Sequence, residues 1–299
     1  MYRMIKTLFI VMMPLTLIGG PAMLDRPNGK IAYTIHGVGS TLVIAMPGMG
    51  DTQNQYRYLT PILVDAGYQV ATIDLRGHGN SSLVWPDYSS AANGSDVVAL
   101  IDELGAKNVI LVGNSIGGAM SVWVAAERPD VINGIVMVNP FVEDGEMKWI
   151  ERIMFKALFA KPWGKSSWLK FYKSNYPSQK PEDFDSHLVE IKEMLSRPGG
   201  YDAFRATIWS SHAKAATRIP EVKAPVMVIF GSKDPDYKDP QAEMEKLQKM
   251  FDAQALMIEG AGHYPHAEFP EITNPAIIDY IKGITHDKET ETQPTESTE

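Results

Sequence analysis

Apolar segments of strand length alternate along the chain with longer segments of helical spacing. Most of the strand-like segments are continuously apolar, whereas the first of them alternates apolar and polar residues. Continuous apolar strands are typical of a parallel sheet that helices cover on both faces, and an alternating strand is typical of an antiparallel edge. The predicted strands are 31–35, 41–46, 69–73, 108–112, 131–138, 226–230 and 255–258. This order predicts an α/β fold with a mostly parallel central sheet flanked by helices.

The predicted helices fill the intervals between these strands. They cover 58–66, 95–104, 117–127, 241–251 and 275–281. Gly67 and Gly105 follow the first two, where a glycine readily takes the left-handed conformation that ends a helix. Ser95 is a candidate N-cap, because its hydroxyl can accept a hydrogen bond from a free backbone N–H of the first turn.

The alternation stops between Phe141 and about Arg218, where helical spacing continues without a clear strand. Because an insertion of this length is too long for a plain loop, we expect a helical cap at 142–218. The cap interrupts a core domain formed by 23–141 and 219–283. Its first part, Lys148 to Lys180, holds eight basic residues and a single acidic one, interleaved with aromatic residues. It is either a cap whose aromatic residues line a pocket or a lid that faces a membrane or attracts anions.

The two ends of the chain have their own patterns. Residues 1–22 carry two basic residues, then the apolar run Leu8 to Ile18, then small residues, which is the layout of a secretory signal peptide or an N-terminal anchor. The apolar run is short for a span, since a helix needs about 20 apolar residues to cross a bilayer. If residues 1–22 act as a signal peptide or an anchor, the protein is secreted or membrane-anchored, which is the location we expect. If they do not, it is cytoplasmic. Residues 284–299 are rich in Glu and Thr and predict a disordered acidic tail.

Composition limits the function classes. A net charge of -8 argues against nucleic acid as a partner, since phosphate backbones are met by clustered Lys and Arg. The chain has no cysteine, which excludes disulfides, thiolate metal sites and a cysteine nucleophile. No histidine and carboxylate cluster completes a metal site, and no glycine-rich run has the spacing of a nucleotide site. We therefore expect neither a metal nor a cofactor, and the sequence favours no oligomeric state.

The segment Gly113-Asn114-Ser115-Ile116-Gly117-Gly118 lies between a predicted strand and a predicted helix. A serine on a strained strand-to-helix turn needs glycines two positions away on each side, because the backbone there is crowded. Such a turn exposes the serine hydroxyl above the sheet. This context identifies Ser115 as a candidate nucleophile rather than an incidental serine in a glycine turn.

An aspartate and a histidine follow Ser115 in the chain. This is the order Ser, Asp, His in which a nucleophile on such a turn is followed by its acid and its base. Asp234 lies just beyond the strand 226–230, and His263 lies in a glycine-rich loop beyond the strand 255–258. His263 is the candidate general base, and Asp234 is the candidate acid that fixes its tautomer. Asp236 is the second choice for the acid, and His266 is a weaker alternative for the base.

Attack by a serine on an acyl carbonyl creates an oxyanion, which backbone N–H groups stabilise. The N–H of Ile116, immediately after the nucleophile, is one expected donor. The other is expected from the loop after the first buried strand, and Met49 in Pro47-Gly48-Met49-Gly50 is the candidate.

On these residues, the sequence resembles the capped serine hydrolases of the α/β-hydrolase fold superfamily from about Lys30 to Gly283. Asp74-Leu75-Arg76-Gly77-His78-Gly79-Asn80-Ser81 is similar to the segment after the fourth strand in many members, and the elbow resembles that of carbon-carbon bond hydrolases. Members usually have His-Gly where this chain has Pro47-Gly48. A serine at the elbow speaks against the dehalogenases and epoxide hydrolases, which use aspartate there.

The resemblance implies hydrolysis of a small-molecule carboxylic ester with a hydrophobic acyl or alcohol group, through an acyl-enzyme. The same residues support two other reactions, carbon-carbon bond hydrolysis and cofactor-free perhydrolysis. A ligand-binding homologue without turnover belongs to a different class, and the intact Ser115, Asp234 and His263 count against it.

Overall fold

The computed structural model describes residues 21–145 and 149–291. Eight strands form one sheet in the order β1-β2-β4-β3-β5-β6-β7-β8. Strands β3 to β8 run parallel, and β2 pairs antiparallel with both β1 and β4. The α/β fold with a mostly parallel sheet is thereby confirmed. The strands are β1 (Ala22–Arg26), β2 (Gly29–His36), β3 (Leu42–Met46), β4 (Gln69–Ile73), β5 (Val109–Asn114), β6 (Ile132–Val138), β7 (Val226–Gly231) and β8 (Gln254–Ile258).

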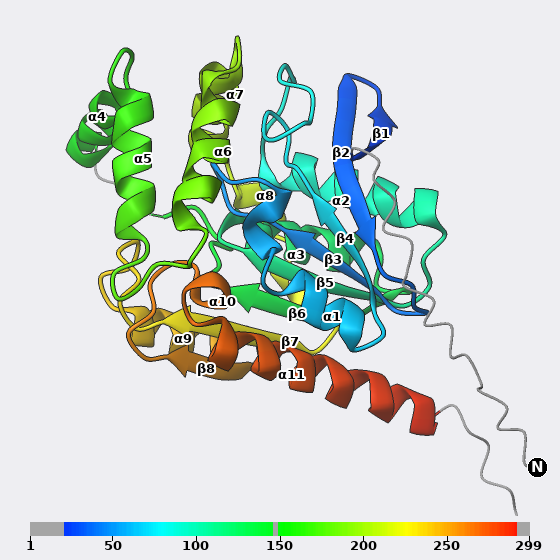
Figure 1. The fold of residues 1–299 in the computed structure, drawn as a ribbon. Coiled ribbons are helices and arrows are strands. Elements are labelled where there is room, and N and C mark those ends of the chain that lie inside the picture. Colours follow the sequence, from blue (N-terminus) through cyan, green and yellow to red (C-terminus); the bar gives the residue numbers. More distant parts are fainter. Residues whose placement is uncertain (1–20, 146–148, 292–299) are drawn as a thin grey trace, which may run out of the picture.

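Side chains of alternate residues in the buried strands pack into two separate hydrophobic cores, one on each face of the sheet. Ile44 packs into the core shared with α2 (Ser90–Leu104), α3 (Ile116–Glu127) and α9 (Pro240–Phe251). Its neighbour Val43 packs into the opposite core with α1 (Thr60–Asp65) and α11 (Pro270–Glu291). The sheet therefore lies between two helical layers, with α2 and α11 on opposite sides of it (Figure 1). This layering explains why the central strands are apolar on both faces.

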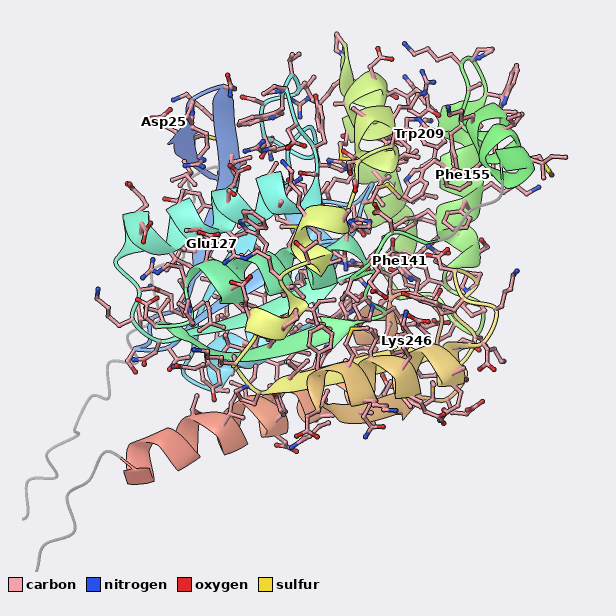
Figure 2. The ribbon with its side chains drawn as sticks, turned by 180° about the vertical axis from the view of Figure 1, so that it is seen from behind. Asp25, Glu127, Phe141, Phe155, Trp209 and Lys246 are labelled. Atoms are coloured by element: carbon pink, nitrogen blue, oxygen red, sulfur yellow. The ribbon has the colours of Figure 1, made fainter. Side chains whose placement is uncertain are left out.

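Between β6 and β7 the chain forms a group of helices and, within the described residues, no strand. Figure 1 shows α4, α5, α6 and α7 standing together at one side of the sheet. Their own aromatic core includes Trp168, Tyr172 and Phe204, and Tyr264 from the loop region after β8 joins it. Phe155 of α4 and Trp209, just after α7, meet edge to face with ring centroids 5.7 Å apart (Figure 2). The helices are α4 (Trp149–Leu158), α5 (Gly164–Ser174), α6 (Phe184–Ser196), α7 (Gly200–Ile208) and α8 (Ala213–Ala216); short turns elsewhere are η1 (Gln53–Tyr56), η2 (Ile219–Glu221) and α10 (Pro265–Glu268).

Three local features differ from what the sequence predicted. The sequence did not predict β1, which pairs with β2. Helix α2 begins five residues before Ser95, because Ser89 caps it by accepting from the Ala92 N–H, while the Ser95 hydroxyl donates back to the Ala91 carbonyl. Helix α11 continues to Glu291, so the expectation of disorder from residue 284 is wrong up to that residue. The rest of the predicted tail, 292–299, and residues 1–20 of the predicted leader lie outside the described residues.

A search of the described residues for a helix long and apolar enough to cross a bilayer finds none.

Candidate active site

Ser115 occupies the turn between β5 and α3, as the sequence predicted. Its backbone has φ +55° and ψ −119°, a conformation that costs free energy for a residue with a side chain. Two backbone hydrogen bonds tie it to β6 and the following loop, because the Ser115 N–H donates to Val138 O at 3.1 Å and the Phe141 N–H donates to Ser115 O at 2.9 Å. The Gly118 N–H of α3 also donates to Ser115 O, at 2.9 Å. The strain is thus maintained by the neighbouring strand β6 and the loop that follows it.

The flanking glycines are required by close backbone approach. A Cβ at Gly117 would lie 2.8 Å from the Met46 carbonyl oxygen, and a Cβ at Gly113 would overlap the Gly117 carbonyl. Either side chain would push the first turn of α3 away from β3 and β5. The spacing seen in the sequence therefore has a steric cause.

Asp234 and His263 meet at the ends of β7 and β8. The His263 Nδ1 lies 2.7 Å from Asp234 Oδ2, and both side chains are buried. Because an ionised carboxylate can only accept, Nδ1 carries the proton in this pair, which leaves Nε2 as the basic nitrogen. The structure thus brings together the two residues that the sequence named as candidate acid and candidate base.

Asp236 is a second carboxylate at the same imidazole. Its Oδ2 lies 3.3 Å from His263 Nδ1, and its backbone N–H donates to Asp234 Oδ1 at 2.9 Å. Burial raises the pKa of Asp236 to about 6. Burial also disfavours the charged form of His263, but Asp234 and Asp236 outweigh it and raise its pKa to about 9. Of the two candidate acids, Asp234 has the shorter contact with His263 Nδ1, and Asp236 adds a negative charge that helps to raise the pKa of His263.

His266, the alternative base, lies elsewhere. Its ring stacks on Tyr56, and its Nε2 lies 3.2 Å from Gln55 Nε2. Burial lowers its pKa to about 3, so the ring is neutral and accepts from the Gln55 amide. It therefore supports the Gln55 side chain and has no contact with Asp234.

The serine and histidine loops are joined by Asn114. Its Nδ2 donates to the His263 carbonyl oxygen at 3.1 Å and to Val138 O at 2.9 Å. The described residues show no hydrogen bond between Ser115 Oγ and the His263 ring. Such bonds are often long without substrate and tighten when it binds.

The loop after β3 lies against the elbow. A Cβ at Gly48 would be 3.2 Å from the Ser115 Cβ and 2.7 Å from Asn114 Oδ1. The Gly48 N–H donates to Gln55 Oε1 at 2.7 Å, the Gly50 N–H to His78 Nε2 at 3.0 Å, and the Asp51 N–H to Gly48 O at 3.4 Å.

Pro47 has no N–H, so Met49 carries the remaining donor of this loop. Among the described residues, the Met49 N–H has no hydrogen-bond acceptor. The Ile116 N–H opens α3, where the first amide groups lack partners within the helix. Neither of the two N–H groups that the sequence singled out has a hydrogen-bond acceptor among the described residues.

Sequence reasoning missed the residues that support the site. His78 is neutral because burial lowers its pKa to about 4; its Nδ1 contacts Arg76 O at 2.9 Å, and its Nε2 accepts from Gly50. Asn139 has φ +43° and joins the two loops, since its Nδ2 donates to Gly262 O and its Oδ1 accepts from the Gly231 N–H. An asparagine at the end of a buried strand, or directly after one, is the signal that could have indicated this role, since Asn114 ends β5 and Asn139 follows β6.

A second buried serine also contacts a histidine. Ser90 Oγ lies 2.5 Å from His212 Nδ1, and Asp144 accepts from the His212 backbone N–H rather than from its ring. Ser90 lies in the first turn of α2 and has no elbow geometry. This pair joins α2 to the helical insertion.

The described residues contain one group with metal-like spacing, Asp234, Asp236 and His263, whose potential ligand atoms lie within 4.8 Å of one another. The His263 nitrogen that faces both carboxylates is Nδ1, which is hydrogen-bonded to Asp234. A metal ion would have to displace the proton that Nδ1 donates to Asp234, so the arrangement fits a proton better than a metal ion.

Comparison with known proteins gives one family. The model of the alpha/beta hydrolase family matches residues 42–276. Mouse (Mus musculus) monoglyceride lipase is 27% identical over 84% of this chain and 84% of its own length. A 2-hydroxy-6-oxononadienedioate/2-hydroxy-6-oxononatrienedioate hydrolase from Pseudomonas sp is 25% identical over 90% of this chain and 99% of its own length.

Solved structures agree on the fold. An esterase from Exiguobacterium antarcticum superimposes with a TM-score of 0.75 at 18% identity, covering 88% of this chain and 100% of the esterase. A bromoperoxidase from Bacillus anthracis superimposes with a TM-score of 0.73 at 22% identity, covering 88% of this chain and 100% of the bromoperoxidase. With the family match and the named hydrolases among its relatives, the chain belongs to the alpha/beta hydrolase family and is a hydrolase.

Proposed function

We propose that this protein is a serine hydrolase that cleaves a carboxylic ester through an acyl-enzyme, with Ser115 as nucleophile, His263 as general base and Asp234 as its orienting acid. The observation that carries the proposal is the buried 2.7 Å contact between Asp234 and His263, held beside the strained Ser115 turn by Asn114. A buried acid–imidazole pair next to an elbow serine is the arrangement that nucleophilic acyl transfer requires.

The reaction then proceeds in two steps. Ser115 Oγ attacks the acyl carbonyl while its proton moves to His263 Nε2, and the oxyanion is bound by the Met49 and Ile116 N–H groups. The alcohol leaves with that proton, and Ser115 remains acylated. A water then loses a proton to His263 and attacks the acyl group, which releases the carboxylic acid and regenerates Ser115.

The helical insertion, residues 142–218, acts as a cap over this site in the proposal. Trp168 packs against Gly50 in the loop beside Ser115, and the Asn175 carbonyl accepts from the His263 N–H at 3.0 Å. The insertion's aromatic core favours a hydrophobic acyl or alcohol group in the substrate. The similarity to monoglyceride lipase supports the same choice.

A scan of p-nitrophenyl esters from acetate to palmitate tests the function. We expect hydrolysis, with kcat/KM increasing by about tenfold for each two methylenes that enter the pocket, because burying one methylene contributes about 0.8 kcal/mol. The increase should stop at the length that fills the pocket. Steady-state release of p-nitrophenol measures it.

Carbon-carbon bond hydrolysis is the second candidate. Similarity to the Pseudomonas hydrolase and the Gly113 to Gly118 elbow favour it. Absence of turnover on every ester, with turnover of a ring-cleavage product such as a 2-hydroxy-6-oxo-dienoate, would replace the ester proposal. Inactivity on both would favour the non-catalytic binding protein. The bromoperoxidase likeness is below 25% identity and supports the fold alone.

Contact with a lipid surface is proposed through the cap or through residues 1–22, with secretion or membrane anchoring as the location. Helix α4 and the turn after it expose five large apolar side chains, at least 46% accessible each. They are Ile150, Ile153, Met154, Leu158 and Trp163. Exposed apolar side chains on one helix, with basic residues such as Lys156 beside them, suit insertion into an anionic headgroup layer.

Vesicle flotation separates the two routes once the N-terminus of the purified protein has been sequenced. A chain that starts near residue 23 and still floats with anionic vesicles binds through the cap, and Ile153→Ser with Met154→Ser should abolish its flotation. Val84→Ser is the matched control, because Val84 is 83% exposed in a loop on the core. An intact Met1 on a cytosolic chain that does not float would contradict both the location and the lipid contact.

A further inference from the structure

Asp51 connects the loop beside Ser115 to two helices of the insertion. It is buried and lies two residues after Met49. Its Oδ1 lies 2.8 Å from His187 Nε2 and accepts from the Thr52 N–H at 2.7 Å, while its Oδ2 accepts from the Tyr172 hydroxyl at 2.7 Å. Tyr172 lies on α5 and His187 on α6. More than 120 residues of sequence thus separate Asp51 from both partners in the insertion.

The contact between Asp51 and His187 is a buried ion pair. Burial disfavours the charged imidazole, but the charge and hydrogen bond of Asp51 outweigh it and raise the pKa of His187 to about 9. Burial likewise opposes ionisation of Asp51, yet His187 lowers its pKa below the usual value. Removing one partner of a buried pair leaves an uncompensated charge, so the pair resists separation.

Two further contacts bring the same helices to the loop. Trp168 of α5 fills the space where a Cβ of Gly50 would lie, and Gly50 has φ +75°. Glu190 of α6 accepts from the Thr52 hydroxyl at 2.7 Å and from Asn54 Nδ2 at 3.0 Å. The loop 47–51 is therefore fixed on one side by the core residues Gln55 and His78, and on the other by α5 and α6.

We infer that Asp51, held by His187 and Tyr172, is a positioning residue through which the cap sets the place of the Met49 N–H. The cap then contributes to the rate of acyl transfer, in addition to shaping the pocket. This inference rests on the proposed function, because it takes the Met49 N–H as an oxyanion donor. Donors act only within about 2.7–3.1 Å of the developing oxyanion, so a small displacement of the loop weakens them.

The test compares three variants of the full chain. Asp51→Asn removes the charge and one acceptor, and Tyr172→Phe removes a single O–H donor while it keeps the ring packing. Asp183→Asn is the matched control: Asp183 accepts from Arg57 Nε at 2.6 Å and from the Tyr58 hydroxyl at 2.7 Å. It therefore joins the start of α6 to the core by an ion pair, without a hydrogen bond to residues 47–51.

Two readouts are measured for each variant: kcat and KM on the preferred ester, and the rate at which a fluorophosphonate labels Ser115. Labelling forms the Ser115 Oγ–P bond and expels fluoride, and it also requires the oxyanion donors. We expect Asp51→Asn to lower kcat and the labelling rate by about 10–100-fold with KM within about twofold, somewhat less than the loss of a whole donor. Tyr172→Phe should lower both about threefold to tenfold, and Asp183→Asn should lower neither.

The outcomes separate the inference from the function on which it rests. A wild-type chain that neither turns over esters nor reacts with the phosphonate at Ser115 defeats the proposed function. A wild type that reacts, with Tyr172→Phe and a folded Asp51→Asn at wild-type rates, overturns the inference alone. If Asp51→Asn does not fold, Tyr172→Phe decides: an unchanged kcat, or a rise in KM only, overturns the positioning role.

Discussion

Ser115→Ala should lower kcat for ester hydrolysis by about 10⁴–10⁶-fold, the loss found when a triad nucleophile is removed. The variant lacks the oxygen that attacks the carbonyl, so only binding and the oxyanion donors remain to assist water. The backbone at this position is strained for serine and alanine alike, since both carry a Cβ, and the variant should keep its melting temperature. Initial rates on the preferred p-nitrophenyl ester, with thermal unfolding of the same samples, measure both quantities.

Ser90→Ala is the control for this experiment. Ser90 is also buried and contacts a histidine nitrogen at 2.5 Å, but it lies in the first turn of α2 and not on a strained strand-to-helix turn. Its loss should leave kcat within about twofold of wild type. If Ser90→Ala were the inactive variant, or if Ser115→Ala retained wild-type activity, the assignment of the nucleophile would be wrong.

Most of the core fold was predictable because its strands are apolar on both faces. Strand β4 was predicted to the residue, since Gly67 and Asp74 bound a short apolar run. The Ser115 turn was predictable for a different reason: its constraints are local, and the glycines at 113 and 117 are needed for contacts that the turn itself creates. A short edge strand such as β1 has a weaker pattern, since much of it is exposed.

The supporting contacts were not predictable because they join residues distant in sequence. Nothing local to Asp51 indicates that His187 and Tyr172 will surround it. Likewise, the role of His78 depends on the Gly50 N–H, 28 residues away. The choice between Asp234 and Asp236 has the same origin, because both lie in one loop and only the three-dimensional path of the histidine loop separates them.

Asp234→Asn should lower kcat by about 10⁴-fold, the loss seen when the orienting acid of a triad becomes an amide. The amide can donate to Nδ1, which favours the tautomer with its proton on Nε2, and this tautomer cannot accept the Ser115 proton. Asp236→Asn should lower kcat by less than about tenfold, because Asp234 still holds the tautomer. Initial rates of the two variants compare them directly when they are measured above the pKa of His263, about 9, where its ring is neutral. A larger loss in Asp236→Asn than in Asp234→Asn would make Asp236 the orienting acid.

The pH dependence of kcat/KM gives Asp236 a separate signature. His263 must be neutral to act as a base, and the two carboxylates raise its pKa to about 9, so kcat/KM of the wild type should increase as the pH rises through that value. Asp236→Asn removes one of the negative charges that stabilise the imidazolium. The pKa of His263 must then fall, and the rise in kcat/KM must move to lower pH while its plateau stays close to the wild-type value. An unmoved pH profile would mean that Asp236 is protonated throughout this range and contributes no charge to His263. A lower plateau at the same apparent pKa would mean that Asp236 orients the ring instead.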